Sequence, residues 1–289
     1  MSDLAHAGGG SVGAGDQAAG LRRLFGTRSP QVVAFASGHG ACGRTTLVVQ
    51  TAAALAAAGH GVVIIDENAA PNNAIASFGL TARYDLMHAL SGERSLRQVM
   101  LQAAPLVRIL PAARAAHALD RMAAPDAMHL SSCLNELQRG ASFVLIDCVA
   151  MKHGHLSRLA AAARHMAVVV AAQGNAITHA YALIKHMAQE RGRDGFQIVI
   201  TRARSGEEAR AIFDNMRRVA RGHLDVRLEY LGAADVPVTA NLADALLSRL
   251  PQVDDGQAAD AGGFLLPPAV PDAFGRPAWQ ARLVHESVL

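Results

Sequence analysis

The stretch SGHGACGRTT, residues 37–46, decides the fold. An apolar run at Gln31–Ser37 leads into it and predicts a strand, and the Ala- and Leu-rich run at Thr45–Ala58 predicts a helix. Glycines let a backbone turn so that its N–H groups point inward, and the helix N-terminus adds positive potential. A strand, a Gly-rich turn and a helix in this order predict a cradle for phosphate.

The residues of this loop fit the phosphate-loop pattern GxxxxGK[ST] with one exception. Gly38, Gly43 and Thr45 take the expected places, and Arg44 stands where the pattern has lysine. The alternative is a plain turn between a strand and a helix, but the flanking strand and helix favour the phosphate site.

The chain beyond this loop alternates between apolar runs and helix-like stretches. Strands are predicted at Gln31–Ser37, Gly61–Asp66, Val107–Leu110, Phe143–Asp147, Met166–Ala172, Phe196–Thr201 and Val226–Leu231. Helices are predicted at Thr45–Ala58, Asp126–Arg139, Leu156–Arg164, Ile177–Arg191 and Gly206–Arg221. Continuous apolar strands separated by helices are typical of a parallel sheet covered on both faces. We therefore expect an α/β three-layer sandwich with a mostly parallel, twisted sheet of about 7–8 strands.

Composition narrows the class of protein. The 289 residues include 51% hydrophobic and only 4% aromatic residues, so Ala, Val, Leu and Ile must build the core. The net charge of +3 does not indicate a nucleic-acid binder. Three cysteines exclude a disulfide framework, and the N-terminus lacks the features of a signal peptide. These observations favour a cytoplasmic protein.

Three regions are expected along the chain. Residues 1–30 are expected to form a flexible tail that carries a short helix at residues 16–25. Residues 31–250 form the α/β domain, and residues 251–289 form an irregular C-terminal tail because they carry Pro, Gly and Asp without periodicity.

Two acidic residues end predicted strands near the phosphate loop. Asp66 ends the second strand, and Asp147 ends the strand that begins at Phe143. A carboxylate at the carboxyl end of a strand that faces a phosphate loop can hold Mg²⁺ or its water shell. Together with the loop, the two residues predict a nucleotide site.

At this point the chain resembles the MinD/ParA group of P-loop ATPases, and within it the FlhG (FleN) flagellar-number regulators, over roughly residues 16–250. SGHGACGRTT is similar to the group's SGKGGVGKTT, VVIIDEN with the later Asn73 to its DxD segment, and FVLIDC to its Walker B strand. AITHAYALIKHM, residues 176–187, resembles the flagellar subgroup's SITDAYALIK. The stretch IVITRARSGEEARAIFDNMRRVARGHLDVRLEYLG, residues 198–232, matches that subgroup's VNRVRS…YLG region.

The resemblance implies a site for ATP or ADP with Mg²⁺. It assigns the nucleotide to Gly38, His39, Gly40, Gly43, Arg44, Thr45, Thr46 and Thr201. It assigns the metal to Thr45, Asp66 and Asp147, and the catalytic positions to Asn68 and Asp147.

Several of these positions depart from the family. His39 replaces the lysine that crosses to the partner in the family's nucleotide-sandwich dimer, and Arg44 replaces the phosphate-loop lysine. Asn68 replaces the carboxylate that orients the attacking water, and an amide cannot accept a proton. Thr201 stands where the family has an adenine-reading Asn. We expect a degenerate site with weak or absent nucleotide binding and little or no ATPase activity.

The segment DQAAGLR, residues 16–22, resembles the DQAxxLR segment by which the subgroup engages FlhF, a signal-recognition-type GTPase. Asp16, Gln17, Leu21 and Arg22 are the expected contacts, and Gln17 is the residue expected to stimulate the GTPase. The resemblance implies a cytoplasmic regulator of flagellar placement or number that acts through FlhF and the flagellar switch and basal-body proteins, with recruitment to the cell pole or inner membrane.

Other interpretations remain open at this stage. One is an active ATPase whose ATP-dependent homodimer binds membrane through the partly apolar C-terminal stretch Trp279–Leu289. Another is a partition or cellulose-related paralogue, and DNA binding is not expected. His153 and His155 are expected in a solvated loop, because no further ligands accompany them in the sequence.

Overall fold

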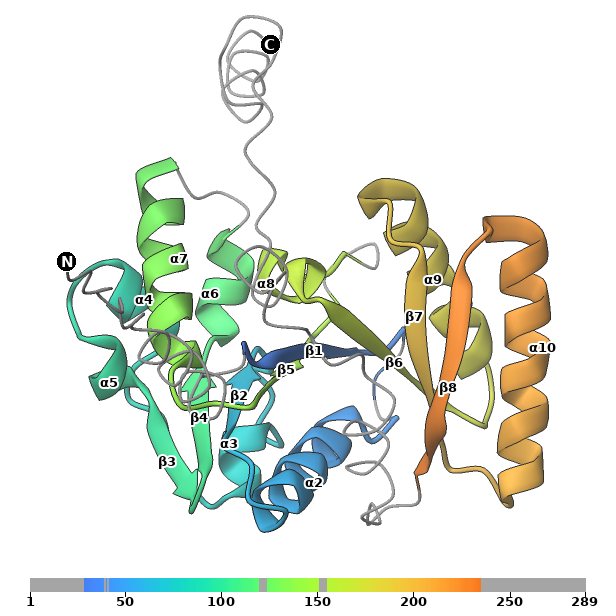
Figure 1. The fold of residues 1–289 in the computed structure, drawn as a ribbon, viewed down its shortest axis with the longest axis horizontal. Coiled ribbons are helices and arrows are strands. Elements are labelled where there is room, and N and C mark those ends of the chain that lie inside the picture. The colour runs from blue at the N-terminus through green and yellow to red at the C-terminus, as the bar shows by residue number, and fades with distance from the viewer. Residues whose placement is uncertain (1–28, 39, 41, 120–123, 151–154, 235–289) are drawn as a thin grey trace, which may run out of the picture.

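A computed structural model describes residues 29–38, 40, 42–119, 124–150 and 155–234 (Figure 1). The strands are β1 (Gln31–Ala36), β2 (Val62–Asp66), β3 (Leu101–Ala104), β4 (Val107–Pro111), β5 (Phe143–Asp147), β6 (His165–Ala171), β7 (Gly195–Thr201) and β8 (Arg227–Ala234). They form one eight-stranded sheet in the order β3-β4-β2-β5-β1-β6-β7-β8.

The described helices connect these strands. They are α2 (Arg44–Ala57), α3 (Ala74–Ser77), α4 (Leu86–Leu90), α5 (Leu96–Val99), α6 (Ala113–Ala118), α7 (Ala124–Gln138), α8 (Arg158–Ala162), α9 (Ala176–Arg191) and α10 (Gly206–Leu224).

The pairing of the strands brings chemically important residues to one edge. All pairs are parallel except β3 with β4, which is antiparallel. Asp66 on β2 pairs with Asp147 on β5, and Asp147 pairs with Phe35 on β1. The loop after β1 therefore starts beside both carboxylates. This edge is where ligands bind in open α/β sheets, outside the carboxyl ends of the strands.

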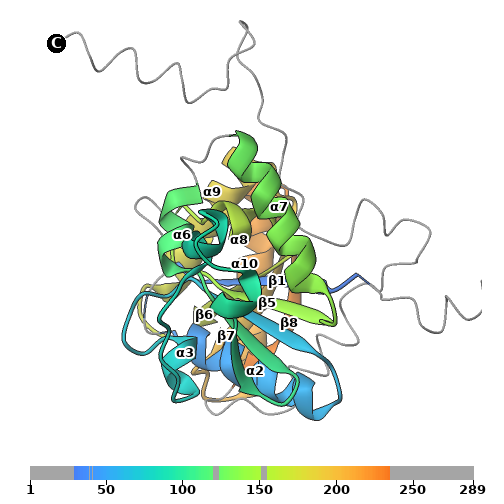
Figure 2. The same cartoon turned by 90° about the vertical axis from the view of Figure 1, so that its left-hand side faces the viewer.

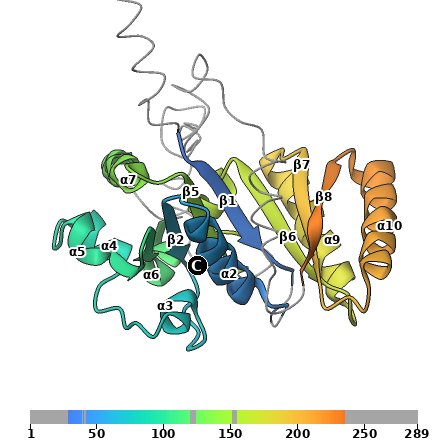
Figure 3. The same ribbon diagram turned by 60° about the horizontal axis from the view of Figure 1, so that its bottom comes forward.

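Two apolar layers hold the sandwich together. Helices α2 and α3 pack against one face, with Leu47, Val48 and Leu55 completely buried. The other face is covered by apolar residues of α4 to α10. Figures 1 and 2 show α2 and α3 on one side of the sheet and α6, α7 and α8 on the other, and Figure 3 shows α10 beside β8 at one end.

The predicted fold class is confirmed, and so are the seven predicted strands to within a few residues at their ends. The short helices α3 to α6 were not predicted, because four to six residues are too few to display a helical period. The antiparallel strand β3 was not predicted because it is not a buried apolar run like the other strands. The predicted helix at Leu156–Arg164 is shorter, since Ser157 caps α8 and Ala163 already has extended backbone.

The outer regions of the prediction lie beyond the described residues. These are the front helix at residues 16–25 and the C-terminal tail at residues 251–289. Among the helices that the structure describes, none is both long enough and apolar enough to cross a membrane.

Candidate functional site

The loop between β1 and α2 begins at a tight contact with α9. A Cβ atom on Gly38 would lie 2.2 Å from the backbone oxygen of His179. At the other end of the loop, Gly43 has a φ of 83° and stands at the N-cap of α2. Both glycines are thus required by the backbone, the first by close approach and the second by its left-handed conformation.

Arg44 points its guanidinium back at the sheet. Its Nε donates to Asp147 Oδ1 at 2.5 Å, and its Nη1 donates to Ser37 Oγ at 3.3 Å. The side chain of Arg44 is 12% exposed and that of Asp147 is fully buried. Burial alone lowers the pKa of Arg44, but the charge and hydrogen bond of Asp147 outweigh it and raise the pKa. Arg44, the cation of the phosphate loop, therefore forms an ion pair inside the protein.

The second oxygen of Asp147 is also engaged. The Thr45 hydroxyl donates to Asp147 Oδ2 at 2.7 Å, and the Asn68 side-chain amide donates to Thr45 Oγ1 at 3.3 Å. Arg44, Thr45, Asn68 and Asp147 thus form one continuous polar network, which we call the Arg44 network.

Asp66 supports the turn that follows β2. Its Oδ1 accepts the backbone N–H of Asn68 and its Oδ2 accepts that of Ile75, each at 3.0 Å. Burial and the nearby charge of Asp147 raise the pKa of Asp66 to about 6. Both carboxylate oxygens therefore already have protein partners.

Glu67 points away from the Arg44 network, as expected for the next residue along a strand end. It accepts a hydrogen bond from the Ser157 hydroxyl, beside α8. Its Oε2 is buried and has no hydrogen-bond partner within the described part of the chain. Burial raises the pKa of Glu67 to about 8. No local sequence pattern indicates this buried acid, because its burial depends on the packing of α8.

Thr201, the position of the expected adenine contact, ties β7 to the loop. Its hydroxyl donates to the Cys42 backbone oxygen at 2.8 Å, and the side chain is buried. The hydroxyl thus binds the loop itself.

The other site residues fall into two groups. Gly40 is exposed and Thr46 is half-buried in the first turn of α2. His39 lies outside the described residues, as do Asp16, Gln17, Leu21 and Arg22. The roles assigned to all of them stay predictions.

A nucleotide with Mg²⁺ needs oxygen ligands for the metal and a cation for the phosphates. The donor types are suitable, since Mg²⁺ prefers hydroxyl and carboxylate oxygens. In the arrangement described, however, the guanidinium of Arg44 lies on Asp147, and each oxygen of Asp147 and Asp66 already accepts one hydrogen bond. A magnesium–phosphate group would have to displace the Arg44 guanidinium from Asp147 to use this carboxylate.

One expectation about the histidines was wrong. His155 lies in a loop and is 42% exposed, as expected, but it does not lack further potential ligands, because its Nδ1 lies 3.0 Å from His186 Nε2 on α9. The signal was hidden because the two residues are 31 positions apart and only the packing of α9 joins them. His153 lies outside the described residues.

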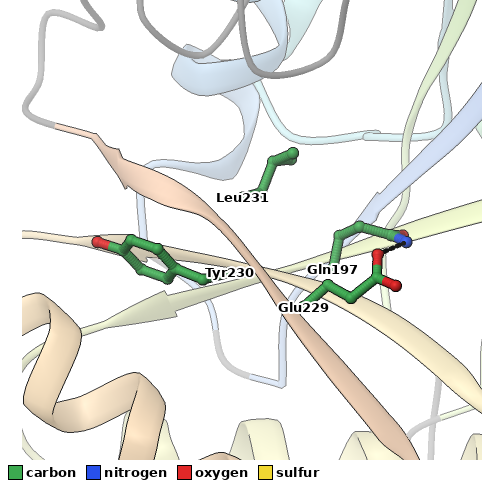
Figure 4. A pocket seen from close by; sticks show the side chains of 4 residues that line it. All are labelled: Gln197, Glu229, Tyr230 and Leu231. Atoms are coloured by element: carbon green, nitrogen blue, oxygen red, sulfur yellow. Dashed lines mark hydrogen bonds between the residues drawn. The ribbon is translucent and has the colours of Figure 1, made fainter. Parts of the chain in front are cut away.

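A separate hollow of about 300 Å³ lies part-way along β7 and β8 (Figure 4). It is lined by Gln197, Glu229, Tyr230 and Leu231, with Gln197 Nε2 donating to Glu229 Oε2 at 3.3 Å. None of these four residues is cationic, so the hollow does not resemble a second phosphate site.

Comparisons with known proteins agree with the α/β fold and the phosphate-loop motif described above. Residues 30–194 match the family model described as AAA domain. The antiactivator FleN of Pseudomonas aeruginosa is 30% identical over 212 residues, which are 73% of this chain and 76% of FleN. The chain belongs to the MinD/ParA-type P-loop ATPase family, in its FlhG (FleN) subgroup. The flagellum site-determining protein YlxH of Helicobacter pylori is 22% identical over 76% of this chain and 78% of its own length.

Solved structures of MinD share the fold. The MinC:MinD complex of Aquifex aeolicus aligns with a TM-score of 0.59 at 16% identity, over 78% of this chain and 98% of that one. The septum site-determining protein MinD of Pyrococcus horikoshii, complexed with Mg-ADP, aligns with a TM-score of 0.51 at 18% identity, over 79% of this chain and 92% of that one.

The contact between Gly38 and α9 leads to a stability prediction. Gly38→Ala forces a Cβ atom into the His179 backbone and should lower the free energy of unfolding by about 1–3 kcal/mol. Gly40→Ala is the matched control in the same loop, since a Cβ there meets nothing within 4 Å. Urea unfolding of both variants tests this prediction. Equal free energies of unfolding for Gly38→Ala and Gly40→Ala would refute it.

The raised pKa of Glu67 makes stability depend on pH. The folded protein keeps this proton up to about pH 8, whereas an unfolded chain releases it near its ordinary pKa of 4.5. The free energy of unfolding should therefore fall as pH rises between these values, by up to about 1.4 kcal/mol per pH unit. Asp66 contributes in the same direction from 3.8 to about 6.

Glu67→Gln removes the contribution of Glu67 to this pH dependence, and the amide oxygen still accepts a hydrogen bond from Ser157. Relative to the wild type, this variant should become progressively more stable from pH 5 to pH 8, as measured by chemical denaturation. Glu93→Gln, at an exposed position, is the control and should follow the wild type. A constant difference between Glu67→Gln and wild type across this range contradicts the assignment.

Proposed function

We propose that this chain is a FlhG-like regulator of flagellar placement or number, built on a MinD-like body. The support is its similarity to FleN, named as an antiactivator, and to YlxH, named as flagellum site-determining. In this role the α/β domain presents partner surfaces, and the protein works in the cytoplasm with recruitment to the cell pole or inner membrane.

The nucleotide site of this regulator is degenerate, and the observation that carries this is the ion pair between Arg44 and Asp147. A lysine in the family's loop serves phosphate as a compact charge, but a planar guanidinium here lies on the Walker B carboxylate. Phosphate and metal must compete with a buried, hydrogen-bonded ion pair before they can bind. Breaking such a pair leaves a buried charge uncompensated, which is costly.

A second feature, independent of the Arg44 ion pair, also reduces hydrolysis. The family's carboxylate for the attacking water is Asn68 in this chain, and its amide donates to Thr45 and accepts from the Ala70 N–H. An amide cannot act as a general base, and loss of such a group costs about 10²–10⁴-fold in rate. Nucleotide binding is therefore weak or lost, and hydrolysis is negligible.

Phosphate release with Mg-ATP, in the presence of FlhF, tests this part of the proposal. The wild-type chain should show turnover at background level, because both the phosphate cation and the base are displaced or missing. The triple change His39→Lys, Arg44→Lys and Asn68→Asp should restore measurable turnover. Arg97→Lys, at an exposed position on α5, is the control and should stay at background. Turnover by the wild type at the level of the triple variant would refute the degenerate site.

An active, ATP-dependent dimer is the second candidate function. It is favoured by the intact frame of the loop, since Gly38, Gly43, Thr45 and Asp147 keep their places and Thr45 contacts Asp147. Size-exclusion chromatography with and without Mg-ATP separates the two. An ATP-dependent dimer supports the enzyme, and an unchanged elution volume supports the regulator.

The expected partner is an FlhF-type GTPase, engaged through residues 16–25, with flagellar switch and basal-body proteins as further partners. Gln17→Ala should reduce stimulation of GTP hydrolysis by FlhF by at least tenfold, since its side chain is the proposed stimulating group. Ser11→Ala, outside the segment, should leave stimulation unchanged. Equal GTPase rates with all three proteins would show that Gln17 is not the stimulating group, and rates equal to that of FlhF alone would remove FlhF as the target of this segment.

A further inference from the structure

A polar cluster lies outside the phosphate loop, where the chain between β5 and α8 meets α9. It consists of His155, which precedes α8, and of His186 and Glu190, one turn apart on α9. The side chain of His186 is 17% exposed, that of His155 is 42% exposed and that of Glu190 is 50% exposed. The cluster is therefore anchored in the protein and open to solvent on one side.

The three side chains converge on one another. His186 Nε2 lies 3.0 Å from His155 Nδ1, and the two imidazole rings are nearly perpendicular, at 87°. His155 Nδ1 lies 3.7 Å from Glu190 Oε2. One ligand atom from each residue falls within 4.8 Å of the others. Ligand atoms around a tetrahedral zinc ion at its usual bond lengths are about 3.3 Å apart. The distances from His155 Nδ1 to His186 Nε2, 3.0 Å, and to Glu190 Oε2, 3.7 Å, lie on either side of this value.

The carboxylate of Glu190 also lies close to His186. Glu190 Oε1 is 3.2 Å from His186 Nδ1. The two oxygens of Glu190 therefore approach both imidazoles, as expected for a third ligand.

We propose that His155, His186 and Glu190 form a binding site for a divalent transition metal of the zinc class. Two imidazoles and one carboxylate are ligands that suit Zn²⁺, Co²⁺ and Ni²⁺, whereas Mg²⁺ and Ca²⁺ prefer oxygen ligands alone. Three protein ligands with a solvent-exposed side leave a fourth position for water. The site is distinct from the Arg44 network and does not depend on the proposed function.

The position of the site gives it a regulatory consequence. His155 belongs to the chain that leaves β5 after Asp147, and α9 contacts the phosphate loop where His179 meets Gly38. A metal bound by His155 and His186 joins these two segments. Metal occupancy therefore holds together the two sides of the carboxyl edge that flank the loop.

The experiment titrates the metal-free full chain with Zn²⁺ in a calorimeter and with Co²⁺ in a visible spectrophotometer. The wild type should bind one equivalent with micromolar or tighter affinity. Co²⁺ bound there should develop the intense visible bands of a low-symmetry, four-coordinate site. His186→Gln and Glu190→Gln should each weaken this equivalent by at least tenfold. Zn²⁺ should also raise the melting temperature of the wild type, and clearly less that of these two variants.

The chain has 13 histidines, so the control must remove imidazoles elsewhere. His117→Gln with His223→Gln, both at exposed positions, should keep the wild-type affinity and cobalt spectrum. Glu190→Gln keeps the proposal testable if the His186 variant fails to fold, because Glu190 is half exposed on the surface of α9. The proposal is overturned if no micromolar binding occurs, or if the cluster variants and the control double variant bind alike.

Discussion

Asp147 is a fully buried carboxylate at the centre of the sheet's carboxyl edge, and the surrounding residues are arranged around its charge. Burial of an unpaired ion costs on the order of several kcal/mol, so the charge must be matched. Arg44 and Thr45 match it through one oxygen each. The same charge helps to raise the pKa values of Asp66 and Glu67, so these neighbouring acids hold protons more tightly. The charge of Asp147 is thereby neutralised within the Arg44 network.

The loop is also connected mechanically to the rest of the domain. Gly38 packs on the backbone of α9, and the Thr201 hydroxyl at the end of β7 holds the Cys42 carbonyl. These contacts link the loop to the half of the sheet beyond β1.

Much of the architecture was predictable because its signals are local. Continuous apolar runs such as Val62–Asp66 and Phe143–Asp147 indicate buried parallel strands, and the glycines of the loop indicate its turn. The departures at Arg44 and Asn68 were equally visible, since they are changes of chemical type at fixed motif positions. Short elements such as β3 were not, because their pairing with β4 depends on long-range contacts.

The sequence by itself determined the order of strands and helices, the family and the residues of the phosphate loop, because these depend on periodicity and on spacing within single segments. Only the tertiary structure decided that Arg44 lies on Asp147, that Glu67 is a buried acid against Ser157, and that His155 meets His186. Each of these contacts joins segments at least 31 positions apart. Side-chain orientation and burial at such distances follow from how the helices pack on the sheet, which no local pattern encodes.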